Sequence, residues 1–389
     1  MDSSWLDFAT RELTSKTMHG TTQLPKVREA TLEDYQQISS LEDHYGLKVR
    51  SFEEWSHLWT GNPLYQQLRR DWPIGWVLED HEKHIVGSIE NIPIPYEFSG
   101  KRIIVSTGRN LVVDSQYRSY SVLLLDYYFG QKSVDLFLEG GVSLEASHAF
   151  ERFQTSPVPN GAWDQSSYWI TDYPGFLERA LKKRAIPLAR ILSYPLSAAL
   201  FCKDRCWTGH GRFHSKKVSV EACTRFDNRF DEFWEKLTTA RPNILLGLRT
   251  RTTLEWHFKF ALLRSKAWIL TVGNGSRLVS YAIFDRNDNR RLGLKRMMLV
   301  DFQSIDGDYS RLLPILSCAL KRCEKEGIHI LDVRGLCPEK RSLIEQVVPY
   351  RRKLPCWLYV YRVQDKSLEQ SLRSPNAWDP SPFDGDSTL

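Results

Sequence analysis

The chain has 389 residues, a 42% hydrophobic content rich in Trp, Tyr and Phe, and a formal net charge of +6. This length suits two domains or one large one, and the apolar content is ample for buried cores. No apolar run approaches the roughly 18 residues of a membrane span, and the first residues lack the basic-then-apolar pattern of a secretory signal. We therefore expect a soluble, cytoplasmic protein without a membrane span.

The charge is modest for this size, and acidic and basic residues are interleaved apart from short clusters such as 182–184 and 351–353. This pattern is typical of a solvated surface, so we expect no nucleic-acid partner. The seven cysteines are an odd number scattered along the chain, which indicates reduced thiols rather than a disulfide framework.

Four metal-type ligands, Cys202, Cys206, His210 and His214, follow the spacing C-x3-C-x3-H-x3-H. On a continuous helix they would form a stripe too long to close on one ion. Glycines at 209 and 211 could break such a helix, but the spacing is unlike that of a zinc finger. We expect no bound metal.

Residues 1–25 are polar and predict a loosely packed extension. A short strand then begins at Val27, and a helix follows a Thr31 cap, with Asp34 as the acidic partner in a capping box. A second helix spans 51–59 and starts with a second such box. Residues 74–79 and 84–89 predict a hairpin whose second strand continues through 92–98.

The stretch 101–131 joins a β-branched strand, residues 102–113, to a helix that starts near Ser119 and ends at Gly130. A strand that runs into a helix N-terminus can present backbone N–H groups and the helix dipole to an anion such as a phosphate. After this helix we expect a strand over 134–142, a helix over 144–153, and an irregular aromatic-rich stretch over 157–172.

This element order resembles that of the GNAT acyltransferase superfamily, in which it forms one mixed sheet. Three segments carry the resemblance: VREATLEDYQQISSLE, the stretch from WVLEDHEKHIVG to RNLVVD, and YRSYSVLLL. The resemblance implies that the start of the central helix holds the pyrophosphate of acyl-CoA. It implies cofactor contacts from the strand residues Leu111, Val112 and Val113 and from the helix start, Arg118, Ser119, Tyr120, Ser121, Val122 and Leu123.

The helix start departs from the family motif, which is Gln or Arg, two residues, Gly, one residue, and Gly or Ala. Arg118 matches the first position, and Ser121 stands at the first glycine. Leu123 stands at the second small residue, where a branched side chain crowds a backbone that must contact a ligand. The departure weakens the expected pyrophosphate site.

Acyl transfer needs a base for the acceptor, donors for the oxyanion, and often a hydroxyl that reprotonates the leaving thiolate. The family often places a tyrosine acid in the helix after the fifth strand, but this chain has Phe150 near that position. Ser147 and His148 are the nearby groups that could transfer a proton. The candidate bases are Glu90, Glu97 and Glu139.

Residues 174–206 predict two or three short helices punctuated by Pro187 and Pro195, which we expect to cover or bridge the domains. Because basic residues accompany the apolar ones, an amphipathic partner-binding or membrane-surface helix is the alternative.

The second half repeats the element order, with a hairpin signal at Asn274-Gly275, a strand over 292–302, a helix over 309–326 and a closing strand over 357–363. Asp306 and Asp308 follow its central strand and would repel a pyrophosphate. We therefore expect no cofactor site in this half, which would instead shape the acceptor pocket.

The tail NAWDPSPFDGDSTL resembles the endings of tandem GNAT-like proteins associated with bacterial surface-polysaccharide functions. Its polar, Pro- and Gly-punctuated sequence predicts either disorder or docking through Trp378 and Phe383.

We therefore predict a mixed α/β protein with two tandem GNAT-like domains, 26–173 and 216–365, a helical bridge over 174–215 and a polar tail over 366–389. The predicted activity is transfer of an acetyl or longer acyl group from acyl-CoA to an amine or hydroxyl of a small-molecule, sugar or amino-acid acceptor. One alternative is a Fem-type transferase that uses aminoacyl-tRNA on a cell-wall precursor. The other is a degenerate GNAT-like protein that binds a ligand without chemistry.

Overall fold

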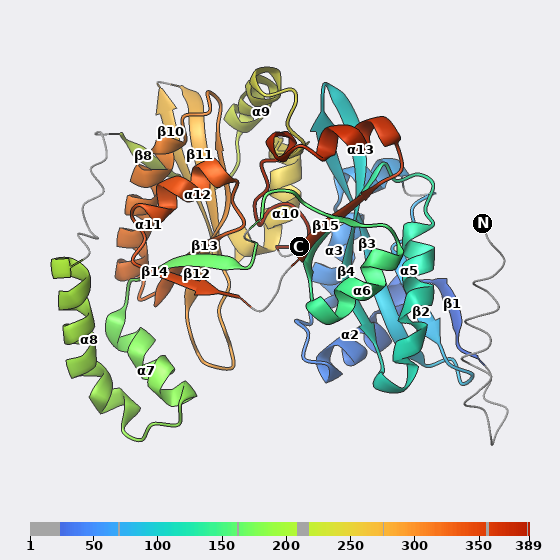
Figure 1. Ribbon diagram of the computed structural model, residues 1–389, viewed down its shortest axis with the longest axis horizontal. Helices are drawn as coiled ribbons and strands as arrows, with labels where there is room; N and C mark the ends of the chain where they lie inside the picture. Colours follow the sequence, from blue (N-terminus) through green and yellow to red (C-terminus); the bar gives the residue numbers. More distant parts are fainter. Residues whose placement is uncertain are drawn as a thin grey trace.

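The computed structural model describes residues 24–68, 71–161, 163–207, 218–274, 276–354, 358–386 and 388–389. They form two mixed sheets that lie side by side with helices around them (Figure 1). The N-terminal extension predicted for 1–25 falls almost entirely outside the described residues. No helix in the described ranges is both long and apolar enough to cross a bilayer.

The first sheet has the strand order β1-β2-β3-β4-β5-β15-β6, and β9 pairs with β3. Its central neighbours β4 and β5 are parallel, and the other pairs are antiparallel. The strands are β1 (Lys26–Glu29), β2 (Gly75–Glu79), β3 (Ile85–Phe98), β4 (Lys101–Val113), β5 (Leu136–Val142), β6 (Ser156–Pro157), β9 (Leu246–Gly247) and β15 (Leu358–Val363).

Local capping signals act where the sequence predicted them. The Asp34 carboxylate accepts a hydrogen bond from the Thr31 N–H at 2.8 Å, and Ser51 Oγ accepts from the Glu54 N–H at 3.3 Å. The helices of this half are η1 (Leu32–Asp34), α2 (Tyr35–His44), α3 (Phe52–Thr60), α4 (Pro63–Leu68), η2 (Ser115–Tyr120), α5 (Ser121–Phe129) and α6 (Leu144–Arg152).

The second sheet has the order β14-β7-β13-β12-β11-β10-β8, with β12 and β13 parallel. The predicted hairpin is present as β10 and β11. The strands are β7 (Gln165–Ile170), β8 (Val220–Cys223), β10 (Ala267–Asn274), β11 (Arg277–Arg286), β12 (Arg296–Ser304), β13 (Ile330–Arg334) and β14 (Tyr350–Lys353). The accompanying helices are α7 (Tyr173–Lys183), α8 (Ala189–Trp207), α9 (Asn228–Ala240), α10 (Arg251–Leu263), η3 (Tyr309–Arg311), α11 (Leu312–Lys325) and α12 (Pro338–Glu345).

The two halves exchange a strand. β7 follows the first half in the chain but pairs with β13 in the second sheet, whereas β15 follows the second half and pairs with β5 in the first sheet. The prediction of an irregular stretch over 157–172 was therefore wrong for β7. The strand predicted over 357–363 exists, but it closes the first sheet rather than its own half. The helices α7 and α8 lie between β7 and β8 in the chain, and both of these strands belong to the second sheet.

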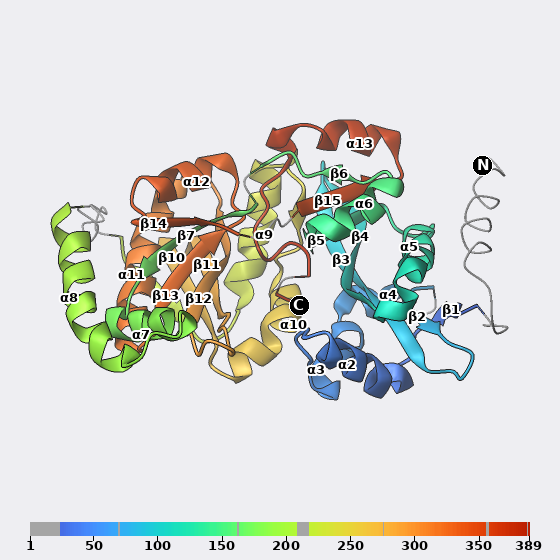
Figure 2. The same cartoon turned by 60° about the horizontal axis from the view of Figure 1, so that its bottom comes forward.

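The tail is folded between the halves, and the C-terminal residue lies at the centre of the molecule (Figure 2). It contains α13 (Lys366–Leu372) and η4 (Pro375–Ala377), followed by the buried side chains of Trp378 and Phe383. Docking through these two aromatic residues is thus confirmed, and disorder of residues 366–386 was the wrong alternative.

Candidate active site

The parallel strands β4 and β5 separate soon after they meet. They pair only at Val105–Leu136 and Ser106–Phe137. Beyond this point side chains bridge the gap: Thr107 Oγ1 donates to the Leu138 carbonyl at 2.7 Å. The carboxyl ends of parallel strands are a common place for a ligand in α/β folds.

The other edge of β4 is also irregular. Ile89 of β3 faces two residues of β4, Asn110 and Leu111, and Asn110 has a φ of 52°. This is a β-bulge, which bends the strand and redirects its side chains. The bulge lies in the part of β4 that no longer pairs with β5, so this strand is irregular on both edges where it borders the cavity.

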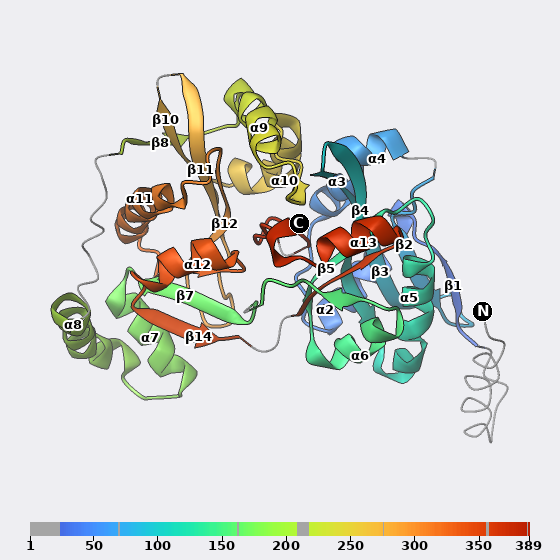
Figure 3. The same ribbon diagram turned by 45° about the horizontal axis from the view of Figure 1, so that its top comes forward.

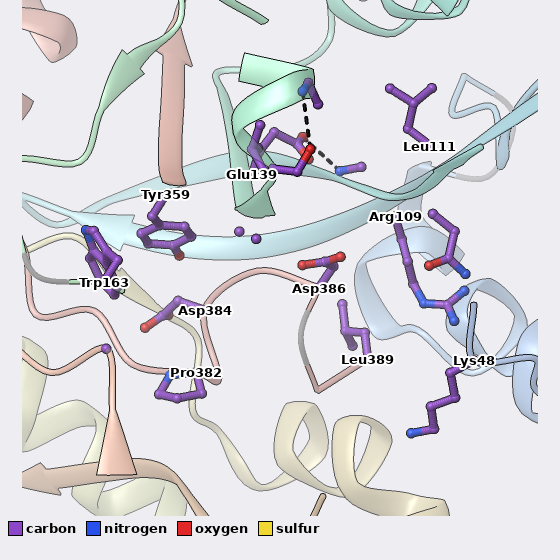
Figure 4. Close-up of a pocket in the computed structure, with 18 of the residues that line it drawn as sticks. Lys48, Arg109, Leu111, Glu139, Trp163, Tyr359, Pro382, Asp384, Asp386 and Leu389 are labelled. Atoms are coloured by element: carbon purple, nitrogen blue, oxygen red, sulfur yellow. Dashed lines mark hydrogen bonds between the residues drawn. The ribbon is translucent and has the colours of Figure 1, made fainter. Parts of the chain in front are cut away.

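A cavity of about 640 Å³ lies at this gap and is lined by residues from both halves (Figure 4). The first half supplies β3, β4, β5, α6 and the segment between α2 and α3. The remaining lining comes from Trp163, β15, the tail and the second half. Residues with polar groups in this lining include Lys48, Arg50, Arg109, Asn110, Glu139, Trp163, Asn287, Arg334, Tyr359, Ser381, Asp384 and Asp386.

Glu139 lies on the cavity wall and is fully engaged by the protein. Its carboxylate accepts hydrogen bonds from the Gly108 N–H at 2.9 Å and from the Tyr128 hydroxyl. Burial raises the pKa of Glu139 well above its ordinary value. A Cβ at position 108 would lie 3.0 Å from Glu139 Oε2, so glycine permits this close approach. Glu139 therefore bridges the separated strands and is poorly suited to act as a base.

Two carboxylates of the tail face the cavity in different environments. Asp384 is held by Arg249 Nη2 at 3.3 Å, by the Tyr96 hydroxyl at 3.0 Å and by the Ser381 N–H at 2.9 Å. In the described part of the chain, no side chain donates a hydrogen bond to the Asp386 carboxylate. Burial raises the pKa of Asp386 to about 7, although the positive charge of Arg109 lowers it. Asp386 can therefore exchange a proton near neutral pH.

Tyr359 is the second available proton-transfer group. It is 5% exposed, lines the cavity, and its hydroxyl has no hydrogen-bond partner in the described part of the chain. Burial raises its pKa well above 10, so the phenol stays protonated. A Cβ built on Gly140 would lie 3.3 Å from Tyr359 Cε2 and 3.5 Å from Asp386 Oδ1. Gly140 thus lets both side chains approach β5.

The predicted catalytic residues are not brought together. Glu90 is buried and does not line the cavity; it pairs with Arg109 and accepts a hydrogen bond from Trp55 Nε1 at 2.5 Å. Neither Ser147, which is buried on α6, nor His148, whose side chain is 78% exposed, lines the cavity. Glu97 is also outside it. Glu139 is the one residue of this set on the cavity wall.

Of the predicted cofactor residues, only Leu111 lines the cavity, and the others follow it in the chain. Leu111 lines the cavity, whereas Val112 is buried and Val113 is half-buried near the end of β4. Arg118, Ser119 and Tyr120 belong to η2, and Ser121, Val122 and Leu123 form the first turn of α5, two residues later than predicted. Arg118 and Ser119 are exposed.

The corresponding gap in the second sheet is filled by the tail. Pairing of β12 with β13 ends at Met298–Asp332. Beyond it, the Phe383 N–H donates to the Val300 carbonyl at 3.1 Å, and Lys340 Nζ donates to the Phe302 carbonyl at 2.8 Å. The tail therefore occupies, in the second sheet, the place that is equivalent to the open gap of the first sheet.

The described residues contain no cluster of three or more His, Cys, Asp or Glu side chains that could hold a metal ion. Cys202 and Cys206 are exposed free thiols on α8. His210 and His214 lie outside the described residues, so the predicted absence of a metal stays a prediction.

Sequence reasoning did not single out Tyr359 or Asp386. Tyr359 reaches the cavity only because β15 joins β5, and Asp386 only because the tail folds back between the halves. No local pattern marks either residue. The nearest signal was the expectation that the tail docks onto the body.

Neither a protein-family model nor a curated protein sequence matches this chain. Solved structures do match it. N-myristoyltransferase from Saccharomyces cerevisiae, solved with bound myristoyl-CoA, is 10% identical with a TM-score of 0.55, over 89% of this chain and 84% of that one. A GCN5-related N-acetyltransferase from Anabaena variabilis is 10% identical with a TM-score of 0.52, over 88% and 73% of the two chains.

A probable N-acyltransferase from Enterococcus faecalis is similar to the same degree, with 10% identity and a TM-score of 0.53 over 88% of this chain and 72% of that one. These likenesses confirm the predicted mixed α/β fold, and they show that this fold is similar to that of a GCN5-related N-acetyltransferase and of N-myristoyltransferase. None of the three is described as a surface-polysaccharide protein, so that resemblance of the tail stays a prediction.

Proposed function

We propose that this chain is an acyltransferase that moves an acyl group from acyl-CoA to an amine or hydroxyl of an acceptor. The observation that carries the proposal is the cavity at the gap between β4 and β5, where Tyr359 and Asp386 present groups without side-chain partners among the described residues. The GNAT fold and the myristoyl-CoA bound by the yeast relative support the same reaction type.

The donor is assigned to the first sheet. Its acyl and pantetheine portions would enter the gap beside Leu111, and its pyrophosphate would lie near Arg118, outside the cavity. The second sheet offers no equivalent space along β12, because residues 379–384 of the tail and Lys340 occupy it. The half without an open gap would shape the acceptor pocket through Arg334 and Asn287.

For an amine acceptor, Asp386 removes a proton from the ammonium, and the freed nitrogen attacks the thioester carbonyl. As the tetrahedral intermediate collapses, the C–S bond breaks, Tyr359 donates its proton to the leaving thiolate, and the nitrogen, which is cationic after the attack, releases its second proton to solvent. Exchange with solvent then removes the proton from Asp386 and restores the one on Tyr359. A pKa of about 7 suits Asp386 to this task near neutral pH. The raised pKa of Tyr359 keeps its hydroxyl protonated, so it can act as the acid.

Calorimetry with acetyl-CoA and longer acyl-CoAs, followed by a free-thiol assay with a panel of amines and alcohols, tests the proposal. We expect binding at one site per chain and release of CoA that depends on the acceptor. Binding without acceptor-dependent release would instead support the non-catalytic alternative. Absence of binding at millimolar ligand would contradict the proposal, and charged tRNA would then test the Fem-type alternative.

A further inference from the structure

Helix α8 shows the reverse of the usual amphipathic pattern. Its buried positions are the small or polar residues Ala189, Ser193, Ser197 and Asp204, which recur at helical spacing. Its large apolar residues face outward. A helix normally buries its apolar stripe against the protein, so the outward face of α8 is one that a second surface should cover.

The exposed apolar residues are concentrated here. Six of the twelve large hydrophobic side chains exposed in the described part of the chain lie within residues 188–201, and Leu188, Ile191 and Tyr194 are 69%, 65% and 60% exposed. Single exposed apolar residues are ordinary, but a continuous patch marks an interaction site. The patch comprises Leu188, Ile191, Leu192, Tyr194, Leu196 and Phe201.

Internal hydrogen bonds hold this orientation. Asp204 is buried on the inner face of α8 and accepts hydrogen bonds from the Tyr173 hydroxyl at 2.7 Å and the Tyr350 hydroxyl at 2.6 Å. The hairpin formed by α7 and α8 lies at the outer end of the second half in all three ribbon views (Figure 3). The patch is therefore presented away from the first half and from the cavity.

The hairpin also carries most of the net charge of the protein. Residues 173–207 contain seven basic and two acidic side chains, a net charge of +5, compared with +6 for the whole chain. Glu178 pairs with Lys182, and Asp204 is buried. The exposed basic residues lie at the turn and toward both ends of the patch: Lys182, Lys183, Arg184, Arg190, Lys203 and Arg205.

We propose that the α7–α8 hairpin docks onto the surface of an anionic phospholipid bilayer, with α8 lying in the plane of the interface. Its apolar patch would enter the headgroup–acyl boundary, and the basic side chains would contact the anionic headgroups. Successive residues of an α-helix are turned by about 100° around its axis. Viewed down the axis of α8, the patch therefore extends from Leu196 through Ile191 to Tyr194, across most of the outward side. So wide a face, flanked by charge of one sign, fits a flat fluid surface better than the narrow groove of a protein.

Flotation of the full chain with phosphatidylcholine vesicles, with and without phosphatidylserine, tests this at about 0.15 M salt. We expect the protein to float with the anionic vesicles and not with the neutral ones. Ile191→Glu should weaken this binding about tenfold or more, because it places a buried negative charge at an anionic interface. Lys182→Glu combined with Lys183→Glu should weaken it through charge alone. Leu263→Glu, at a 72% exposed apolar site on α10, is the matched control and should bind like the parent chain.

Two results would overturn the proposal. One is the absence of flotation at about 1 mM anionic lipid, a concentration at which interfacial helices bind. The other is an equal loss of binding in Ile191→Glu and Leu263→Glu. Light scattering of the lipid-free protein provides a further check: a dimer that Ile191→Glu dissociates would assign the patch to a second copy of the chain and contradict the lipid assignment.

Discussion

At the scale of single residues, the carboxylates that line the cavity are of two kinds. Some are hydrogen-bonded parts of the structure, and one can exchange protons. Glu139 and Asp384 are each bound by several donors, whereas Asp386 has no hydrogen bond from another described side chain. Tyr359 stands out among the buried hydroxyl groups of the first sheet because it faces the cavity without a partner. Gly140, which lacks a side chain, allows these two groups to share one wall.

The first prediction concerns the pH dependence of turnover. Since Asp386 must be deprotonated to act as a base, kcat/KM should rise with pH through about 7 and then level off. Asp386→Asn should remove this rise and lower kcat/KM by about 10²–10⁴. Asp384→Asn is the control: it should keep the same pH profile but lower the melting temperature, because it weakens the bonds to Arg249 and Tyr96. An unchanged profile in Asp386→Asn would exclude Asp386 as the base.

As pH rises, the free energy of unfolding should fall while kcat/KM rises. The pKa of Asp386 is raised in the folded state, so the folded protein binds the proton more tightly than the unfolded chain does. The free energy of unfolding contributed by this group therefore falls as pH rises from about 4 to about 7. Asp386→Asn removes that loss and should raise the melting temperature relative to the parent chain more at pH 8 than at pH 4. A lower melting temperature at pH 8 would show that Asp386 has a structural role.

The role of Tyr359 as an acid is tested by removing its hydroxyl group. Tyr359→Phe should lower kcat by about tenfold or more for acceptors with poor proton-transfer ability of their own, with little change in the Kd for acyl-CoA. Tyr361→Phe, a buried tyrosine two positions along the same strand, should leave kcat unchanged. Equal effects of the two substitutions, measured by the free-thiol assay, would point to packing of β15 rather than to proton transfer.

At the scale of elements, the site depends on where β4 stops pairing with β5 and on how the chain then enters α5. The sequence predicted the strand, the helix and the anion-binding joint between them. It could not show that a six-residue 3-10 helix, η2, separates β4 from α5. This difference arises because Asp114 accepts a hydrogen bond from the Gln116 N–H, a local turn that competes with an immediate α-helix.

Arg118 provides the test at this scale. Arg118→Glu should weaken acyl-CoA binding by about tenfold or more, because it replaces a charge-assisted contact to the pyrophosphate by repulsion. The melting temperature should stay nearly unchanged, since Arg118 is exposed. Arg102→Glu, an exposed arginine at the opposite end of the same strand, is the matched control and should bind as the parent does. Retained affinity in Arg118→Glu, measured by calorimetry, would remove the pyrophosphate from this position.

At the scale of the whole molecule, the exchange of β7 and β15 and the buried tail join the halves into one structure. The Asp379 carboxylate accepts hydrogen bonds from Arg241 Nη1 at 2.8 Å and from Lys340 Nζ at 2.9 Å, and the Lys340 side chain is fully buried. These bonds hold the tail across the second sheet. The cavity therefore depends on contacts far from its own wall.

Asp379→Ala should lower the free energy of unfolding by about 3–5 kcal/mol, because it leaves Lys340 charged and buried without its partner. Adding Lys340→Met to this variant should recover part of the loss. Glu369→Ala, which removes an exposed pair with Arg373 on α13, should leave the urea midpoint unchanged. A loss no greater than that of Glu369→Ala would show that the tail is not held by this ion pair.

Most helices and strands could be predicted from the sequence, because capping, turn chemistry and apolar period act within a few residues. The sequence therefore predicted the mixed α/β fold, the repeated element order and the position of most helices and strands. The tertiary structure alone decided which sheet β7 and β15 join, since a strand pattern does not specify its partner. For the same reason Tyr359 and Asp386 were missed: they lie more than 200 residues from β4 and β5, and only long-range packing brings them to the gap.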